Sequence, residues 1–332
     1  MNLKHSLLAF VFLSLGFGAQ VFAKGFDAEL TEYPYPFPVQ KHTFESQKNS
    51  LAMVYMDVPA ADAKQKDAIV LLHGKNFNGA YFEEIAKTLA KKGYRVIIPD
   101  QIGFGKSSKP KAYQYSIHTL AENTHSLMKT LDIQKYQVLG HSMGGMIATR
   151  LALMYPDEVT KLFLVNPIGL EDWKTMTGYK TVDELYKIEL ENSVEKTRKY
   201  QVEAYYDGKW KPEYDRWLSP LVGWLEGPDR ELIAWSAALT SDMVYTQPVF
   251  YEFKNVKMPT VLVIGQRDRT AIGKAWAPEA VKPKMGLYPQ MGKTVSKMIP
   301  KSKLIELPGL GHLPFIENPE MFWKSLEKEW TK

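Results

Sequence analysis

The sequence predicts an α/β fold with a mostly parallel, eight-stranded sheet that is flanked by helices. Several short runs, such as 68–72 and 259–265, are apolar throughout, which is typical of strands buried on both faces. Amphipathic helical stretches separate these runs along the chain, as crossover connections between parallel strands require. A long helical stretch at 171–254 interrupts this alternation once, so we expect an insertion in an otherwise regular core.

The first 23 residues have the features of a secretory signal peptide. Lys4 and His5 form a weakly basic start, an apolar run follows at 7–15, and Val21 and Ala23 fit a small-x-small cleavage site. The apolar run is shorter than the ~20 residues that a membrane-spanning helix needs. We therefore expect cleavage near Ala23, a secreted or periplasmic protein, and no stable membrane anchor afterwards.

Residues 24–40 contain alternating aromatic residues and prolines, from Tyr33 to Pro38. Because proline cannot donate to a strand ladder, this stretch predicts an extended arm on the domain surface. The two β-like runs that follow, 42–47 and 51–58, are separated by a short polar turn and predict an antiparallel hairpin.

The predicted core domain comprises residues 41–170 and 255–332. Its further strands are expected at 68–72, 94–98, 136–139, 161–165, 259–265 and 303–307, and its helices after 82, at 116–131, at 144–153 and from 319 onward. The stretch 274–296 is rich in proline, lysine and glycine, so it predicts a loop with a short helix and no assignable role.

Residues 171–254 are expected to form a helical lid inserted after the sixth strand. They hold five of the eight tryptophans and eight of the eighteen tyrosines, and no β-like run occurs among them. A lid rich in aromatic rings suits an apolar substrate pocket. The alternative is that most of these rings form the core of the insertion itself.

Composition excludes several classes of function. The chain has no cysteine, which rules out disulfides, thiolate nucleophiles and cysteine-ligated metals. Its seven histidines show no chelating spacing, so we expect no metal and no cofactor. The net charge of +5 is scattered over the sequence, which does not favour nucleic-acid binding.

Gly105-Lys106-Ser107 resembles the end of a phosphate loop, but Asp100 stands where that motif needs glycine. A small-molecule substrate is the expected partner, and the oligomeric state stays open.

Ser142 lies in a G-x-S-x-G pattern with Gly140 and Gly144, between the predicted strand 136–139 and the predicted helix 144–153. This context is typical of a nucleophile elbow. A serine in a tight strand-to-helix turn leaves no space for neighbouring side chains, and the two glycines provide that space. The free N–H groups of the following helix would point at the same place.

Two further candidates, Asp268 and His312, also follow predicted strands. The carboxyl ends of parallel strands meet at one edge of a sheet, so Ser142, Asp268 and His312 can converge there. His312 would take the serine proton as a general base, and Asp268 would hold its imidazole in the required tautomer. Asp172 is a weaker candidate for the acid, because Asp268 better fits the loop after the penultimate strand.

An oxyanion hole would complete the chemistry, since acyl transfer places negative charge on the carbonyl oxygen. Met143 N–H, directly after the serine, is one candidate donor. The second is Lys75 N–H, or alternatively Asn76 N–H, in the turn after the strand 68–72. The candidate substrate-binding residues are Phe77, Pro167, Ile168, Trp173 and Leu313.

The sequence resembles the α/β-hydrolase superfamily from His42 to its end. The matching pieces are His73-Gly74, Pro99-Asp100-x-x-Gly103-x-Gly105-x-Ser107, Gly140-His141-Ser142-Met143-Gly144-Gly145, Gly265-x-x-Asp268 and Gly311-His312. The resemblance implies a cofactor-free serine hydrolase, similar to the subgroup of esterases, lactonases, carbon–carbon bond hydrolases and prolyl aminopeptidases. The turn Lys75-Asn76-Phe77-Asn78 departs from the family, because it lacks the proline or glycine pair of epoxide hydrolases and some carbon–carbon hydrolases.

The leading hypothesis is hydrolysis of a carboxylic ester, or a lactone, of a small to medium apolar acyl substrate. Amide or peptide hydrolysis, carbon–carbon cleavage and perhydrolysis on the same scaffold are the alternatives. An aminopeptidase would need carboxylates that hold the substrate amine, for which the insertion offers Glu171, Asp172, Glu203 and Asp207. A non-catalytic ligand-binding protein is a further alternative, but it would not need all three members of the triad.

Overall fold

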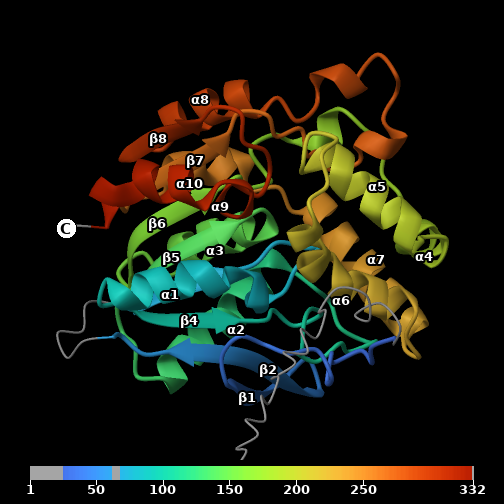
Figure 1. Ribbon diagram of the computed structural model, residues 1–332, viewed down its shortest axis with the longest axis horizontal. Helices are drawn as coiled ribbons and strands as arrows, with labels where there is room; N and C mark the ends of the chain where they lie inside the picture. Colours follow the sequence, from blue (N-terminus) through green and yellow to red (C-terminus); the bar gives the residue numbers. More distant parts are fainter. Residues whose placement is uncertain (1–24, 62–67, 331–332) are drawn as a thin grey trace, which may run out of the picture.

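The computed structural model describes residues 25–61 and 68–330, and the expected signal peptide lies outside these residues. An eight-stranded sheet with the strand order β1-β2-β4-β3-β5-β6-β7-β8 forms the centre of the molecule (Figure 1). The predicted α/β fold with its mostly parallel sheet is confirmed.

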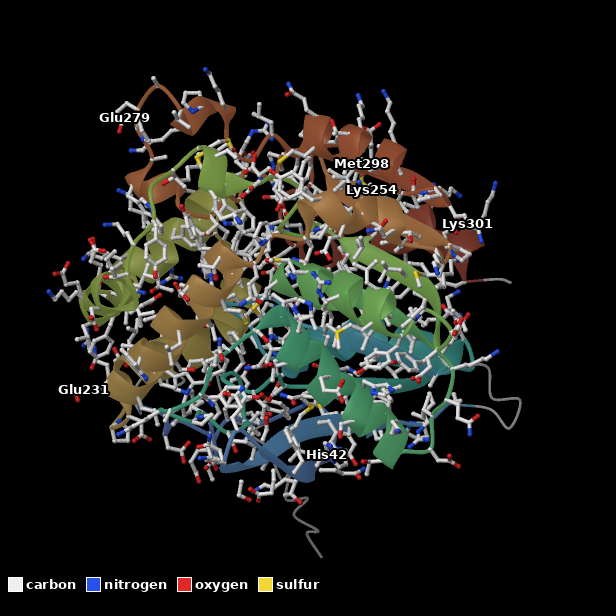
Figure 2. The ribbon with its side chains drawn as sticks, turned by 180° about the vertical axis from the view of Figure 1, so that it is seen from behind. His42, Glu231, Lys254, Glu279, Met298 and Lys301 are labelled. Carbon is white, nitrogen blue, oxygen red and sulfur yellow. The ribbon has the colours of Figure 1, made fainter. Side chains whose placement is uncertain are left out.

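Strands β1 (Val39–Ser46) and β2 (Asn49–Val58) form the predicted antiparallel hairpin, and β2 also pairs antiparallel with β4. All remaining neighbours in the sheet are parallel. His42 of β1 and Lys301, directly before β8, mark the two edges of the sheet (Figure 2). The other strands are β3 (Ala68–Leu72), β4 (Arg95–Pro99), β5 (Tyr136–His141), β6 (Val159–Val165), β7 (Thr260–Gly265) and β8 (Ser302–Leu307).

Helices cover both faces of the sheet. On one face, α1 (Glu83–Lys91) and α10 (Pro319–Leu326) pack their apolar sides into a core that contains Ile85 and Phe322. On the other, α2 (Ile117–Thr130), α3 (Met143–Met154) and α8 (Tyr288–Met298) enclose a second core, visible from behind in Figure 2. Strands buried on both sides explain why their sequences are apolar throughout.

The range 274–296, expected to be a loop with a short helix, contains two single 3₁₀ turns and most of helix α8. The turns are η5 (Lys274–Trp276) and η6 (Lys282–Lys284), and α8 is an 11-residue helix that packs against β7 and β8. Pro289 lies in the first turn of this helix, where the missing N–H costs nothing. The helix extends to Met298, two residues past the expected range.

Four longer helices occupy the range 171–254, and they gather at one end of the sheet in Figure 1. Local signals explain their starts: Thr181 and Glu184 form a capping box on α4, and Ser193 caps α5. The helices are α4 (Val182–Leu190), α5 (Val194–Ala204), α6 (Asp215–Leu225) and α7 (Arg230–Thr246). The remaining short helical segments of the chain, some of them within this range, are η1 (Gly79–Phe82), η2 (Trp173–Thr175), η3 (Pro212–Tyr214), η4 (Phe250–Asn255), α9 (Pro314–Glu317) and η7 (Glu327–Glu329).

The segment from 25 to 38, before β1, packs between α6 and the loop that follows β4. Phe26 N–H donates to Gly223 O of α6 at 2.8 Å, and Trp224 Nε1–H donates to Asp27 O at 3.1 Å. On the core side, Tyr35 O–H donates to the Asp100 carboxylate at 2.6 Å. Leu30 is fully buried, so this arm is more deeply packed than an arm lying on the surface.

Within the described ranges, none of the helices is both long and apolar enough to cross a membrane.

Candidate active site

Ser142 occupies the turn between β5 and α3 with a left-handed backbone, at φ 55° and ψ −121°. A Cβ on Gly140 would lie 2.2 Å from the carbonyl oxygen of Gly144, and a Cβ on Gly144 would lie 1.9 Å from the carbonyl oxygen of Leu72. Neither position can hold a side chain without moving a strand. The turn is therefore a strained elbow of the kind that the G-x-S-x-G pattern predicts.

The serine stands at the N-terminus of α3, where it is the residue before the first helical position. Its side chain lies at the surface of the core, with 7% of the residue exposed. The N–H of Met143 begins the helix, and free amides at such a terminus favour negative charge nearby.

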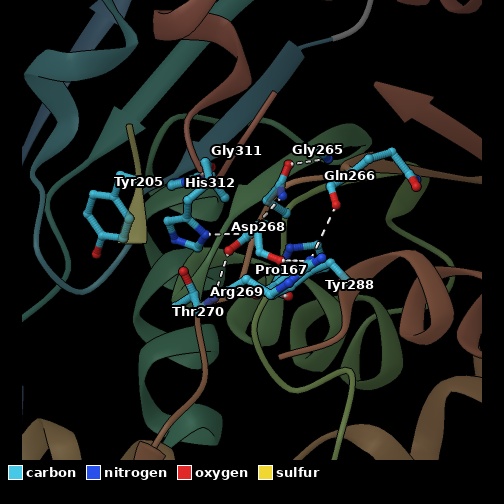
Figure 3. Close-up of polar contacts among 12 residues, drawn as sticks. Pro167, Tyr205, Gly265, Gln266, Asp268, Arg269, Thr270, Tyr288, Gly311 and His312 are labelled. Carbon is cyan, nitrogen blue, oxygen red and sulfur yellow. Dashed lines mark hydrogen bonds and ion pairs between the residues drawn. The ribbon is translucent and has the colours of Figure 1, made fainter. Parts of the chain in front are cut away.

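His312 and Asp268 form a buried pair beside this elbow. His312 Nδ1–H donates to Asp268 Oδ2 at 2.7 Å, and both side chains are almost completely buried (Figure 3). The other carboxylate oxygen accepts the Thr270 N–H at 2.8 Å. A carboxylate on Nδ1 fixes the tautomer of the imidazole, so that Nε2 carries the lone pair of a general base.

Asn166, directly after β6, also holds the carboxylate, through the same oxygen that His312 bonds. Its Nδ2–H donates to Asp268 Oδ2 at 2.8 Å, while its Oδ1 accepts the Gly265 N–H at 3.0 Å. Asn166 has φ 40°, a conformation that asparagine tolerates better than most residues. Sequence reasoning missed it, although an asparagine directly after a buried strand was a usable signal.

We expect Asn166→Ala to lower kcat/KM for an ester substrate about 10- to 100-fold. The variant removes a hydrogen bond to a charged group, which is worth about 1.5–3 kcal/mol. Steady-state kinetics measures the loss, and urea unfolding separates it from lost stability. Asn49→Ala, at the first residue of β2, is the control, because among the described residues that amide bonds only to the carbonyl oxygens of Gln47 and Ala112. Equal activity of the two variants would contradict a role for Asn166.

His141, directly before Ser142, joins the elbow to the loop that carries His312. Its Nε2–H donates to the carbonyl oxygen of His312 at 2.8 Å, and its Nδ1 accepts the Tyr81 O–H at 2.8 Å. The Tyr81 oxygen in turn accepts the Gly74 N–H at 3.0 Å. Burial, followed by the nearby His312, holds the pKa of His141 well below its ordinary value. A neutral imidazole can donate on one side and accept on the other, so His141 connects three loops.

The turn after β3 lies directly against the serine. A Cβ on Gly74 would be 3.0 Å from the Cβ of Ser142. In the parts of the chain that the structure describes, the N–H groups of Lys75, Asn76 and Met143 have no hydrogen-bond acceptor. Unpaired N–H groups on both sides of a serine are the donors that an oxyanion hole requires.

A cavity of about 900 Å³ lies between the strand-end loops and α4–α7. On the core side it reaches Asn76, in the turn beside the serine, and Thr270, which is bonded to Asp268. The opposite wall is apolar and aromatic, with Leu185, Ile188, Tyr200, Leu221, Trp224, Val244 and Tyr245. The cavity therefore opens next to the candidate reacting groups and is suited to an apolar ligand.

The five candidate substrate-binding residues do not line this cavity. Phe77 stacks on Tyr81 with ring centroids 4.7 Å apart, and Leu313 is fully buried. Trp173 is buried as well, and its Nε1–H donates to the carbonyl oxygen of Tyr245 at 2.9 Å.

Pro167 and Ile168 lie beneath the elbow instead. The carbonyl oxygen of Pro167 accepts the Tyr288 O–H at 3.1 Å, and Ile168 N–H donates to the carbonyl oxygen of Ser142 at 3.2 Å. Both residues support the turn that carries the serine, and the cavity wall comes from α4–α7 and the loop after β7.

No group of three or more histidine, aspartate or glutamate side chains in residues 25–61 and 68–330 is arranged to hold a metal ion.

Comparison with known proteins agrees with the fold. The family model for the alpha/beta hydrolase fold matches residues 67–191. The crystal structure of a probable hydrolytic enzyme from Pseudomonas aeruginosa PAO1 superposes with a TM-score of 0.91 at 47% identity, over 94% of this chain and 99% of that one.

Two curated relatives are similar at lower identity. Lipase 1 of Psychrobacter immobilis is 28% identical over 255 residues, 76% of this chain and 73% of its own length. A pimeloyl-[acyl-carrier protein] methyl ester esterase of Aeromonas hydrophila is 26% identical over 282 residues, 82% of this chain and 98% of its own length.

Proposed function

The chain belongs to the α/β-hydrolase family and is a hydrolase, and we propose that it cleaves a carboxylic ester, or a lactone, of a small to medium apolar acyl substrate. The observation that carries this proposal is the buried His312–Asp268 pair, which His141 holds against the elbow of Ser142. The similarity to a lipase and to a methyl ester esterase supports an ester as the substrate.

The proposed reaction begins with Ser142. Its hydroxyl oxygen attacks the ester carbonyl while Nε2 of His312 removes the proton, and the carbonyl oxygen becomes negatively charged. Asp268 stabilises the imidazolium that forms and keeps the ring in one orientation. His312 then gives the proton to the alcohol oxygen, the C–O bond breaks, and the acyl group stays on the serine.

Water completes the cycle by the reverse sequence. His312 removes a proton from water, the hydroxide attacks the acyl-enzyme, and the proton returns to Ser142 as the acid leaves. In both halves the N–H groups of Met143 and of Lys75 or Asn76 would stabilise the negative oxygen. Removal of one such donor typically costs about 2.7–4 kcal/mol.

The substrate range follows from the cavity. Its volume of about 900 Å³ and its aromatic wall suit an apolar acyl or alcohol group. We propose that the helical range 171–254, which supplies this wall, acts as a lid. We also propose that residues 1–23 direct export to the periplasm or the medium, with the mature chain beginning near Lys24.

A fluorophosphonate probe tests the nucleophile directly, since it phosphonylates an activated serine irreversibly. We expect labelling of the wild-type protein at Ser142, found by peptide mass spectrometry, and none of Ser142→Ala. p-Nitrophenyl butyrate should be hydrolysed by the wild type and not by Ser142→Ala. An unlabelled wild-type protein, or equal turnover by the variant, would refute the mechanism.

Rates of hydrolysis, compared between the wild type and Ser142→Ala, also separate an ester substrate from an amide or a lactone. Of the four acidic residues that could hold a substrate amine, Glu203 lines the cavity, whereas Glu171 accepts the Gly286 N–H at 3.0 Å and Asp172 caps η2. Proline p-nitroanilide and a γ-lactone, measured beside the ester, show which bond is cleaved fastest. Faster cleavage of the anilide would replace the ester with an amide in the proposal.

A further inference from the structure

Tyr205, the residue directly after α5, covers one face of the His312 imidazole. The two rings are stacked with centroids 4.8 Å apart and an interplanar angle of 19° (Figure 3). Only 3% of Tyr205 is exposed. The imidazole therefore donates a hydrogen bond from Nδ1 to Asp268 and has an aromatic ring on its face, which together restrict its rotation.

The same side chain reaches the candidate oxyanion turn. Its hydroxyl oxygen accepts a hydrogen bond from Asn76 Nδ2 at 3.1 Å. Burial, the largest cause, and then Tyr200 raise the pKa of Tyr205 well above its ordinary value. Tyr205 is thus a neutral phenol that supports the turn beside Ser142.

The backbone fits this arrangement closely. A Cβ on Gly311 would lie 2.6 Å from the carbonyl oxygen of Tyr205. Only a glycine before His312 lets the end of α5 approach the histidine loop so closely. The contact between the inserted helices and the site therefore depends on Tyr205 in the insertion and on Gly311 in the core domain.

We propose that Tyr205 is a positioning residue, which holds the His312 imidazole and the Asn76 turn in place together and so couples the inserted helices to the catalytic site. This inference rests on the proposed function. Since α5 carries the tyrosine, displacement of α5 would remove both supports in one step. The site would be fully assembled only while the helical insertion is closed over it.

Two variants separate the two contacts. Tyr205→Phe keeps the ring and loses the hydrogen bond to Asn76, so we expect kcat for p-nitrophenyl butyrate to fall about fivefold with little change in KM. Tyr205→Leu loses the stacked ring as well, and we expect kcat/KM to fall about 30-fold or more. Tyr206→Phe is the matched control. The Tyr206 ring packs on Tyr214, and its hydroxyl lacks a hydrogen-bond partner among the described residues.

The split between kcat and KM provides a readout that general destabilisation would not move. With kcat expressed per serine that the fluorophosphonate labels, unfolded protein does not contribute to the value. A displaced imidazole should then lower kcat in Tyr205→Leu, while KM stays close to the wild-type value.

Labelling of the wild type separates failure of this inference from failure of the proposed function. Fluorophosphonate labelling of Ser142 is expected in the wild type and in each variant, more slowly in Tyr205→Leu, whereas an unlabelled wild type would mean that the hydrolase mechanism itself is wrong. If both Tyr205 variants match Tyr206→Phe in kcat and KM, the positioning role is overturned. Should Tyr205→Leu not fold, the fivefold loss in Tyr205→Phe alone decides, because that variant removes a single oxygen atom.

Discussion

Replacing His312 with alanine should lower kcat for p-nitrophenyl butyrate about 10⁶-fold, equivalent to roughly 8 kcal/mol of the activation free energy. The proposed mechanism gives His312 both proton transfers, and in the variant the serine keeps its proton. The free energy of unfolding should change far less than the activation free energy, because the elbow and the Asp268–Asn166 contact remain. Kinetics at high enzyme concentration measures the residual rate.

His118 serves as the control for this substitution. It is an exposed histidine on α2, so His118→Ala should stay within about twofold of the wild type. Retention of more than about a hundredth of the wild-type kcat by His312→Ala would show that a different group acts as the base.

Gly144→Ala should lower the free energy of unfolding by more than about 4 kcal/mol. Losses of this size are exceptional, and overpacking of a buried site is one of their causes. The new methyl group would lie 1.9 Å from the carbonyl oxygen of Leu72, and 2.9 Å from that of His73. Backbone atoms of a central strand cannot rotate away as a side chain can, so β3 and α3 must separate. Urea unfolding followed by circular dichroism measures the loss, and an absence of folded protein would be its extreme form.

Gly178→Ala provides the comparison at an unconstrained glycine. A Cβ there would meet no atom within 4 Å, so its stability should stay within about 1 kcal/mol of the wild type. Similar stability of Gly144→Ala and Gly178→Ala would contradict the close packing of the elbow against β3.

Most of the core could be predicted from the sequence because its signals are local. The run Ala68–Leu72 is apolar at every position, and the structure places β3 within the same limits. Ser142 could be identified because a strained elbow needs glycines two residues before and after it, and this requirement appears directly in the sequence. The limits of the helix expected in 274–296 could not be predicted, since Pro289 and Gly292 of α8 are local signals of a loop.

The partners of the site residues could not be predicted, because they depend on contacts between distant parts of the chain. Asn166 is 102 residues from Asp268, and Tyr205 is 129 residues from Asn76. No periodicity or spacing relates such positions. The cavity lining could not be predicted for the same reason. In the sequence Ile188 and Val244 look like ordinary apolar residues of helices, and they line the cavity only because α4 and α7 pack together over the strand ends.

In the part of the chain that the structure describes, the arm at 25–38 ties α6 to the core domain but does not tie α5. It bonds to α6 through Gly223 and Trp224, and to the core through Asp100, whereas α5 reaches the core through Tyr205. Release of α6 would require this arm to detach as well. With the helical insertion acting as the lid proposed above, a substrate would enter on the side of α4 and α5, and removal of the residues up to 35 would free α6 to open too.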